Sequence, residues 1–550
     1  MTKMSRIMVK GKPFLSLGGQ SHNSSSYVLD NMGPTWHSIK AIGGNTLATP
    51  VPWDTFEPEE GQFNRKFVTD LIDEARRQDL KLAFLWFATW KNGSSQYVPA
   101  WVKGNRERFQ RCLLKDGTPI HQLSAHCPAN MEADRKAYAE LIRTIRDYDS
   151  EEQTVIAVQV ENEAGIQGGT RRDFSPFGEA AYHAAVPAEL IDYCKANPDC
   201  ILAGVWKKNG EREGADWAET FGYYGAEAVT AYAIARYIDD VCAAGKEIYP
   251  DLFMYLNVWL DGGSRGKGQN LAGIDWPSGC ATSRNLDIYY ATLKAIDTVA
   301  PDNYQTTHFR HKEVTDTYAH PEKGFPLYVP ESAKFGINMG QMFYALAEKK
   351  AIGYHIFGSE TALMPDLKTL NPMGIQTMHN FRMLRDAAPL IFEYQDRDRI
   401  WSAVQEEKEE SVVVDGFDGD ILMKVCFIGN DGDWTKTDYP HRNEEAVPPD
   451  PTLLPEPGRA LIFQESEKVF YFVGHNATVT IEKRPPVDGS IPAVYADYTL
   501  LHVNMDSYST TQGHFDEDGK FVVDIVRSGD ESRHGVWLRY DTGVVRVELV

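Results

Sequence analysis

Short apolar runs alternate with longer helix-compatible segments over roughly the first 390 residues of the chain. Runs of this kind are typical of buried parallel strands, and segments with apolar residues at helical spacing, such as 67–78 and 134–148, are typical of connecting helices. Eight strands are predicted, at residues 14–19, 45–51, 80–87, 155–160, 253–259, 302–305, 326–330 and 351–357. Eight successive strand–helix units predict an α/β fold, a closed (β/α)8 or TIM barrel.

The connection between the fourth and fifth predicted strands, about residues 166–252, is too long for a single crossover. It begins with a polar, Gly-rich stretch and continues with helix-compatible segments. Because loops at the carboxyl ends of barrel strands carry function, we expect a helical insertion over the barrel mouth.

The pattern changes beyond about residue 395, where β-type runs such as 459–464 and 477–483 follow one another without a helical period. This favours an all-β domain with a sandwich-like architecture. The predicted domains are therefore a catalytic barrel in residues 1–390 and a β-sandwich in 391–550. A Pro-rich stretch at 447–457 predicts an extended surface loop within the second domain.

The charge balance narrows the classes of partner. Lys and Arg number 56 against 78 Asp and Glu, a formal net charge of -22, which repels nucleic acid and anionic membrane surfaces.

The start of the chain has no apolar run of signal-peptide length, so we expect a cytoplasmic protein. Seven scattered cysteines without a CxxC pair predict neither a disulfide framework nor a zinc site. Whether the chain forms a homo-oligomer is left open.

Two glutamates follow predicted strands at the functional end of the barrel. Glu163 comes after the fourth strand, in VIAVQVENEAG, and Glu331 comes after the seventh. Two carboxylates directed into one barrel mouth can cleave a glycosidic bond, since one protonates the leaving oxygen and the other attacks the anomeric carbon. The alternative interpretation of each is a solvated or ion-paired side chain. Glu161, two residues before Glu163, is interpreted as structural or as a support for the side chains that contact substrate.

Aromatic and polar residues after neighbouring strands suit a saccharide pocket. Trp53 and Glu57 follow the second strand, and Trp90 and Asn92 follow the third. Sugars stack apolar ring faces on indoles and need polar partners for their hydroxyls. The alternatives are core packing for Trp53, and likewise for Trp86 near the end of the third run, and, for Glu57, an ion pair that holds its loop.

Two further side chains complete the predicted substrate site. His22 follows the first strand and either bonds a sugar hydroxyl or caps its own loop. Tyr304 lies at the end of the sixth predicted strand, where its hydroxyl could hold the attacking carboxylate.

The motifs PWDTFEPEEGQF, VIAVQVENEAG and VPES, in this order, resemble those of retaining glycosidases on (β/α)8 barrels. Among these retaining glycosidases the chain resembles glycoside hydrolase family 35, the β-galactosidases. The resemblance is to a bacterial subgroup with an additional C-terminal β-domain. The resemblance implies that Glu163 is the general acid/base, Glu331 the nucleophile, and Asn162 the amide that binds the sugar 2-hydroxyl. It implies hydrolysis of terminal β-D-galactosyl residues of oligosaccharides without a metal or cofactor.

Two departures from the family pattern concern the sugar preference. The third strand is followed by WFATWKNG in place of an R-P-G-P-Y-type segment, and Glu331 lies in PESAKFG in place of a T-E-aromatic context. Another β-glycoside, a β-D-fucoside or an α-L-arabinopyranoside therefore stays open as the substrate.

Two other functions compete with this hypothesis. Gly262–Gly266 fits the G-x-S-x-G pattern of serine esterases, but the following residues lack the helix that a nucleophile elbow requires. A non-catalytic saccharide-binding protein fits the tryptophans but gives Glu163 and Glu331 no joint purpose.

Overall fold

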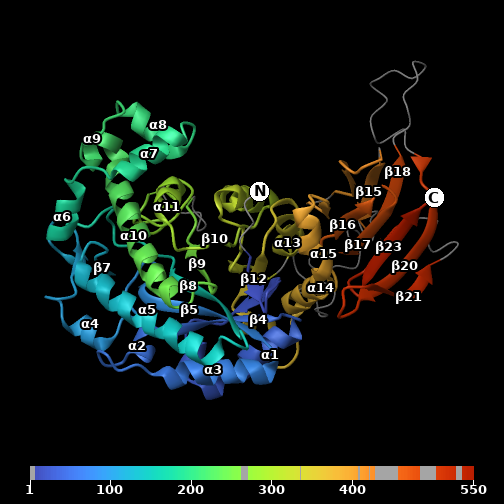
Figure 1. Cartoon of the computed structure of the whole chain (residues 1–550), viewed down its shortest axis with the longest axis horizontal. Helices are drawn as coiled ribbons and strands as arrows, with labels where there is room; N and C mark the ends of the chain where they lie inside the picture. The colour runs from blue at the N-terminus through green and yellow to red at the C-terminus, as the bar shows by residue number, and fades with distance from the viewer. Residues whose placement is uncertain are drawn as a thin grey trace, which may run out of the picture. The chain divides into compact units, whose positions relative to one another are not determined.

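The computed structural model describes the chain in two compact units (Figure 1). The first unit comprises Met1–Trp36, Asn45–Tyr304 and His320–Glu331, and the second comprises His37–Gly44, Gln305–Ala319 and Ser332–Val550. The described residues are 6–261, 271–334, 336–406, 409–419, 421–427, 456–483, 503–527 and 535–550. The GxSxG pattern at 262–266 and most of the Pro-rich stretch lie outside them.

Eight strands form one sheet in the order β11-β10-β9-β8-β5-β4-β3-β12, a nearly closed barrel. The pairings from β3 through β10 run parallel. Their bounds are β3 (Ser16–Gln20), β4 (Thr46–Pro52), β5 (Lys81–Lys91), β8 (Val155–Asn162), β9 (Phe253–Val258), β10 (Thr298–Asn303), β11 (Glu331–Ser332) and β12 (Gly353–Phe357). The predicted α/β barrel is confirmed.

Three strands of the barrel depart most from their predicted bounds. The third, β5, continues to Lys91, four residues past the predicted end at residue 87. The sixth, β10, spans Thr298–Asn303 and therefore begins four residues before the predicted 302–305. The seventh, β11, contains only Glu331 and Ser332, after the predicted run 326–330. Pro326 and Pro330 flank that run and have no N–H to donate to a neighbouring strand, so the buried run forms no regular ladder.

The helices around the barrel follow from apolar faces at helical spacing. Helix α3 (Arg65–Gln78) buries Phe67, Leu71 and Ala75 on one face, and its first turn is capped by the Asn64 side chain. The other helices up to β12 are α1 (Gly33–Ala41), α2 (Trp53–Phe56), α4 (Ala100–Gly104), α5 (Pro128–Asp149), α6 (Pro176–Tyr182), α7 (Ala188–Ala196), α8 (Ile201–Lys208), α9 (Trp217–Phe221), α10 (Gly225–Ile248), α11 (Leu286–Thr292), α12 (His308–Tyr318) and α13 (Ile337–Glu348). Four short helices, α6 to α9, precede the long α10, which confirms a helical insertion between β8 and β9.

Hydropathy gives no candidate for a membrane-spanning helix in the described parts of the chain.

The chain changes from helices to strands where the pattern predicts it. The last helices are α14 (Pro372–Asp386) and α15 (Ala388–Asp396), and the strands that follow begin at Ile400. One antiparallel sheet has the order β13-β16-β17-β23-β20-β21, and a second contains β14, β15, β18, β19 and β22. Their bounds are β13 (Ile400–Val404), β14 (Ser411–Val414), β15 (Ile421–Phe427), β16 (Arg459–Ser466), β17 (Val469–His475), β18 (Ala477–Lys483), β19 (Val503–Asn504), β20 (Ser507–Phe515), β21 (Phe521–Arg527), β22 (Val536–Leu538) and β23 (Val544–Leu549).

One apolar core joins both antiparallel sheets. Ile462, Phe472 and Val545 of the first sheet and Met423 and Val479 of the second belong to a single buried cluster. Alternating strand residues turned into a shared core are the basis of a β-sandwich, so the predicted all-β architecture is confirmed. The boundary at residue 390 stays a prediction.

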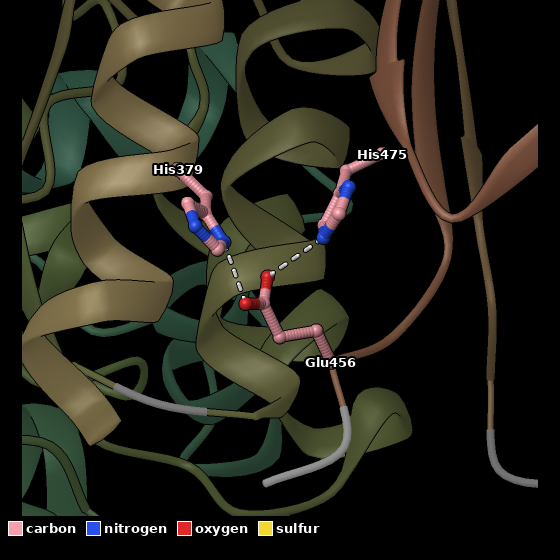
Figure 2. A group of neighbouring side chains, drawn as sticks. All are labelled: His379, Glu456 and His475. Carbon is pink, nitrogen blue, oxygen red and sulfur yellow. Dashed lines mark hydrogen bonds and ion pairs between the residues drawn. The ribbon is translucent and has the colours of Figure 1, made fainter. Parts of the chain in front are cut away.

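A buried ion network lies within the second unit (Figure 2). His379 Nδ1 of α14 lies 2.6 Å from Glu456 Oε1, and His475 Nε2, at the end of β17, lies 3.5 Å from Oε2. The guanidinium of Arg459, whose side chain has no exposed surface, lies 3.0 Å from Oε2 of the same carboxylate. Glu456 is therefore the counter-ion of a fully buried cation.

Replacing Glu456 by glutamine is expected to lower the free energy of unfolding by about 3–5 kcal/mol, because it leaves the buried Arg459 charge uncompensated. Chemical denaturation at pH 7 measures this change. Glu548→Gln is the matched control, since Glu548 pairs with the partly exposed Arg546 at 3.1 Å and its loss is expected to cost about 0–1 kcal/mol. Equal effects of the two substitutions would contradict the assignment of Glu456 as the counter-ion of the buried Arg459.

Acid is expected to weaken the same network. Burial alone would raise the pKa of Glu456, but the hydrogen bond from His379 and the charge of Arg459 lower it to about 2. A carboxyl group whose pKa is lower in the folded state stabilises the fold above its unfolded pKa of about 4.3. This stabilisation is lost as the pH falls from about 4.3 to 2. Unfolding free energies measured over that range should decline more steeply for the wild type than for Glu456→Gln.

Candidate active site

The carboxyl end of β8 carries the residues that the sequence analysis singled out. Val155–Asn162 is buried throughout, as expected for a barrel strand. Glu161 and Glu163 have φ values of 63° and 46°, a left-handed conformation that is strained for residues other than glycine. Such strain persists only where the surroundings hold the backbone in place, and it is concentrated at functional sites.

Neighbouring strand ends supply the bonds that hold this tip. The backbone N–H of Asn92 donates to the Asn162 carbonyl at 3.2 Å, and that of Gly93 donates to the Glu163 carbonyl at 3.1 Å. The N–H of Glu163 donates to Oδ1 of Asn257 on β9 at 2.9 Å. The strained tip of β8 is thus fixed from β5 and from β9.

Glu331 and Tyr304 are in direct contact. The Tyr304 hydroxyl, just after β10, donates to Glu331 Oε2 at 2.7 Å, and Glu331 is 5% exposed. Burial and then the charge of Glu331 raise the pKa of Tyr304 well above its usual range. The phenol therefore stays protonated and remains a hydrogen-bond donor to the carboxylate.

A third carboxyl group, Asp302 of β10, joins the two glutamates. Its Oδ2 accepts a hydrogen bond of 2.7 Å from Asn257 Nδ2, so Asn257 links Asp302 to the backbone of Glu163. Burial, followed by the charges of Glu331 and Glu163, raises the pKa of Asp302 well above its usual range. The structure thus brings the three carboxyl groups into one electrostatic environment, in which Asp302 favours its neutral form.

Three polar residues of this site, Lys91, Asn257 and Asp302, have no role in the sequence analysis. Lys91, the last residue of β5, donates from Nζ to Asn162 Oδ1 at 2.9 Å and also bonds Asn92 Oδ1. Asn257 is the penultimate residue of β9. The signal in the sequence that could have identified them is a polar residue at the carboxyl end of an apolar run. The same signal identifies Glu163.

Trp53 and Glu57 bond to each other in the interior. The Trp53 indole N–H donates to Glu57 Oε2 at 2.8 Å, and the backbone N–H of Gly61 donates to Glu57 Oε1 at 2.7 Å. Trp53 has no exposed surface and packs edge-on against Trp101 at 5.9 Å. Packing and loop anchoring account for both side chains, so we assign them no substrate contact.

The remaining predicted residues occupy different surroundings. Trp90 is 1% exposed, with its ring edge-on to Tyr237 at 4.8 Å. Asn92 is exposed on the turn after β5, beside Lys91 and Asn162. His22 is exposed in the loop after β3. Asn92 thus lies beside Lys91 and Asn162, whereas the buried ring of Trp90 packs against Tyr237.

Glu161 lies in a separate buried network. Its Oε2 accepts from the backbone N–H of Trp90 at 2.6 Å. Burial and then the charge of Asp134 raise the pKa of Glu161 well above its usual range. Asp134 in turn accepts from the Trp86 indole at 2.8 Å and the Thr89 hydroxyl at 2.6 Å. Glu161 therefore anchors the end of β8 to β5.

One group among the described residues has a composition suited to a metal ion, namely His379, Glu456 and His475, with ligand atoms within 4.8 Å of one another. Its surroundings do not fit a cation. The Arg459 guanidinium lies 3.0 Å from the carboxylate, and the backbone N–H of Tyr540 donates to His475 Nδ1 at 3.3 Å. That bond places the ring proton of a neutral His475 on Nε2, the atom that would have to bind the metal. The group is an ion network.

The fold and the site define a (β/α) barrel protein with a buried cluster of carboxyl groups at its strand ends. The family model described as a domain of unknown function, DUF5597, matches residues 377–539. A β-galactosidase of Xanthomonas manihotis is 29% identical over 179 residues, which are 30% of this chain and 26% of that protein. The chain thus matches about a quarter of the length of this curated relative.

Solved structures that match this chain in part include a β-galactosidase and a β-amylase. The β-galactosidase of Rahnella sp. R3 has a TM-score of 0.49 at 15% identity, over 71% of this chain and 58% of that chain. The catalytic domain of a β-amylase from Paenibacillus polymyxa has a TM-score of 0.47 at 11% identity, over 66% of this chain and 97% of that chain. The assignment of the barrel rests on the chain's own strand order.

Proposed function

We propose that the protein is a retaining exo-glycosidase that releases terminal β-D-galactosyl residues from oligosaccharides. The hydrogen bond from Tyr304 to Glu331 carries the proposal, because the phenol holds one carboxyl group in place, and the charges of Glu331 and Glu163 both act on the neighbouring Asp302. The partial sequence similarity to a β-galactosidase supports the choice of sugar.

In the proposed mechanism Glu331 attacks the anomeric carbon while protonated Glu163 donates its proton to the leaving oxygen. Glu163 then removes a proton from water, which hydrolyses the glycosyl–Glu331 bond and restores both groups. Burial and the charges of Glu331 and Glu163 raise the pKa of Asp302, so the surroundings of the two glutamates disfavour a third negative charge.

Two buried atoms of the site are complementary to a sugar hydroxyl. Glu331 Oε1 and Asn162 Nδ2 have no hydrogen-bond partner among the described residues. A hydroxyl group donates one hydrogen bond and accepts others, so one hydroxyl beside the anomeric carbon can satisfy both atoms. We propose this contact for the sugar 2-hydroxyl. Asn92 and His22 are proposed to contact hydroxyls at the exposed edge of the site.

Proton NMR of the hydrolysis of 4-nitrophenyl β-D-galactoside tests the mechanism. A retaining enzyme releases the β-anomer first, and mutarotation then produces the α-anomer. Retention requires the two carboxyl groups to lie about 5–5.5 Å apart, whereas inversion requires about 6.5–9.5 Å. Initial release of the α-anomer would therefore refute the proposed double displacement.

A panel of nitrophenyl glycosides tests the sugar preference. We expect the β-D-galactoside to have a higher kcat/KM than the β-D-glucoside, β-D-fucoside and α-L-arabinopyranoside. A different order would keep the mechanism and change the substrate. Binding of galactose without turnover of any glycoside would favour a non-catalytic saccharide-binding protein.

A further inference from the structure

Lys91 is an unusually buried cation beside the proposed reaction centre. It ends strand β5 and is 8% exposed. A buried ammonium group is costly unless acceptors replace its lost water, and Lys91 Nζ has two, Asn162 Oδ1 at 2.9 Å and Asn92 Oδ1. Both acceptors belong to strand ends that surround the carboxylates.

The chemistry of lysine decides the orientation of the Asn162 amide. An ammonium group has three donors and no acceptor, so it can face only the oxygen of the amide. The NH2 end of Asn162 must then point away from Lys91. Asn162 has no exposed surface, and its Nδ2 has no partner among the residues described. This orientation leaves the buried Nδ2 of Asn162 available to an acceptor atom of a ligand. Such a contact would be favourable, because a buried donor without a partner costs free energy.

The backbone of Lys91 is fixed to the same strand tip. Lys91 and Ser94 exchange N–H···O=C bonds of 2.9 and 3.1 Å, which closes a tight turn. Within this turn Asn92 and Gly93 have φ values of 52° and 63°. A Cβ on Gly93 would lie 2.9 Å from Pro277, so the turn has no room for a side chain at this position. The ammonium group is therefore presented from a closed, hydrogen-bonded turn.

Lys91 also acts electrostatically on the carboxyl cluster. Burial, Glu331 and Glu163 raise the pKa of Asp302, and the positive charge of Lys91 opposes them. The cation thus lies near enough to offset part of the negative charge of the site while its hydrogen bonds hold Asn162.

We infer that Lys91 is a positioning residue that locks the amide of Asn162 with its NH2 group toward the substrate, and so selects glycosides with a free hydroxyl next to the anomeric carbon. This inference rests on the proposed function. It predicts that the contribution of Lys91 to catalysis depends on the 2-hydroxyl of the substrate.

The test compares Lys91→Met with the wild type on two substrates, the nitrophenyl glycoside that the wild type cleaves best and its 2-deoxy counterpart. Lys91→Met is expected to lower kcat/KM about 10- to 100-fold on the parent glycoside, the loss typical of one charge-assisted hydrogen bond. On the 2-deoxy glycoside the loss should be about tenfold smaller, because the contact that Lys91 supports is absent and only its electrostatic effect on the carboxyl cluster is removed. Adding Lys91→Met to Asn162→Ala should cause little further loss.

Two further variants separate positioning from folding. Lys91→Gln keeps a donor for Asn162 Oδ1 and should retain part of the discrimination between the two substrates. Lys81→Met is the matched control, because Lys81 lies at the other end of β5 and donates to the carbonyls of Glu152 and Gln153. It should leave the discrimination unchanged. Thermal unfolding of each variant reports on the fold.

The outcomes distinguish this inference from the proposed function. Equal losses on both substrates, in folded variants of an active enzyme, would overturn the role of Lys91 and leave the glycosidase proposal standing. A wild-type protein that hydrolyses none of the glycosides would overturn both.

Discussion

Glu331→Gln is expected to lower kcat by about 10⁴- to 10⁶-fold on every glycoside that the wild type hydrolyses. The amide has nearly the same shape and can still accept the hydrogen bond from Tyr304, but it cannot attack the anomeric carbon. The thermal unfolding temperature should therefore change little while turnover disappears. Steady-state kinetics together with thermal unfolding measure the two effects.

A covalent label identifies the nucleophile directly. A 2-deoxy-2-fluoro-β-D-galactoside with a good leaving group slows both steps, and we expect the glycosyl-enzyme to accumulate. Mass spectrometry of the digested protein should find the added sugar on the peptide that contains Glu331. Glu140→Gln is the matched control and should still be labelled on the peptide that contains Glu331. Glu140 is a largely buried glutamate of α5 that pairs with Arg65 and Arg143. Label on another carboxylate would refute the assignment of Glu331.

Glu163→Ala is expected to lower kcat/KM by about 10²- to 10⁴-fold on oligosaccharides, the usual contribution of general acid catalysis. The first step should suffer much less with a nitrophenyl leaving group, because such a group departs without a proton. Hydrolysis of the glycosyl-enzyme then becomes slow, since no base activates water. A burst of nitrophenol followed by slow turnover is the expected kinetic signature.

Azide distinguishes the roles of the two glutamates. In Glu163→Ala azide needs no base and should attack the glycosyl-enzyme, which gives a β-galactosyl azide. In Glu331→Ala azide should occupy the space of the lost carboxylate and give the α-galactosyl azide. NMR of the products distinguishes the α and β anomeric configurations of the two azides. The same configuration from both variants would contradict the division of roles between Glu163 and Glu331.

Local sequence was sufficient for most of the barrel. Continuous apolar runs predict buried strands because both faces of a parallel sheet are covered, and β8 follows its predicted bounds closely. The apolar spacing of α3 likewise predicts its buried face. The failures occur at β10 and β11, where prolines and polar residues interrupt the pattern and the neighbouring strands determine which residues pair.

For the candidate site, too, the sequence predicted some features and left others undecided. Glu163 and Glu331 could be selected because each carboxylate follows a predicted strand at the functional end of the barrel. The bond of Trp53 to Glu57 could not be distinguished from a sugar contact, because the same indole N–H suits either partner. Only the folded chain shows that the two side chains satisfy each other.

The sequence by itself determined which elements form and where their polar ends lie, because these depend on the spacing of neighbouring residues. The tertiary structure alone decided which polar ends meet. Asn257 reaches the backbone of Glu163, and Lys91 reaches the amide of Asn162 across 71 residues of sequence. Such contacts depend on strand order and register in the closed sheet, and no local pattern encodes the distance between two side chains on different strands.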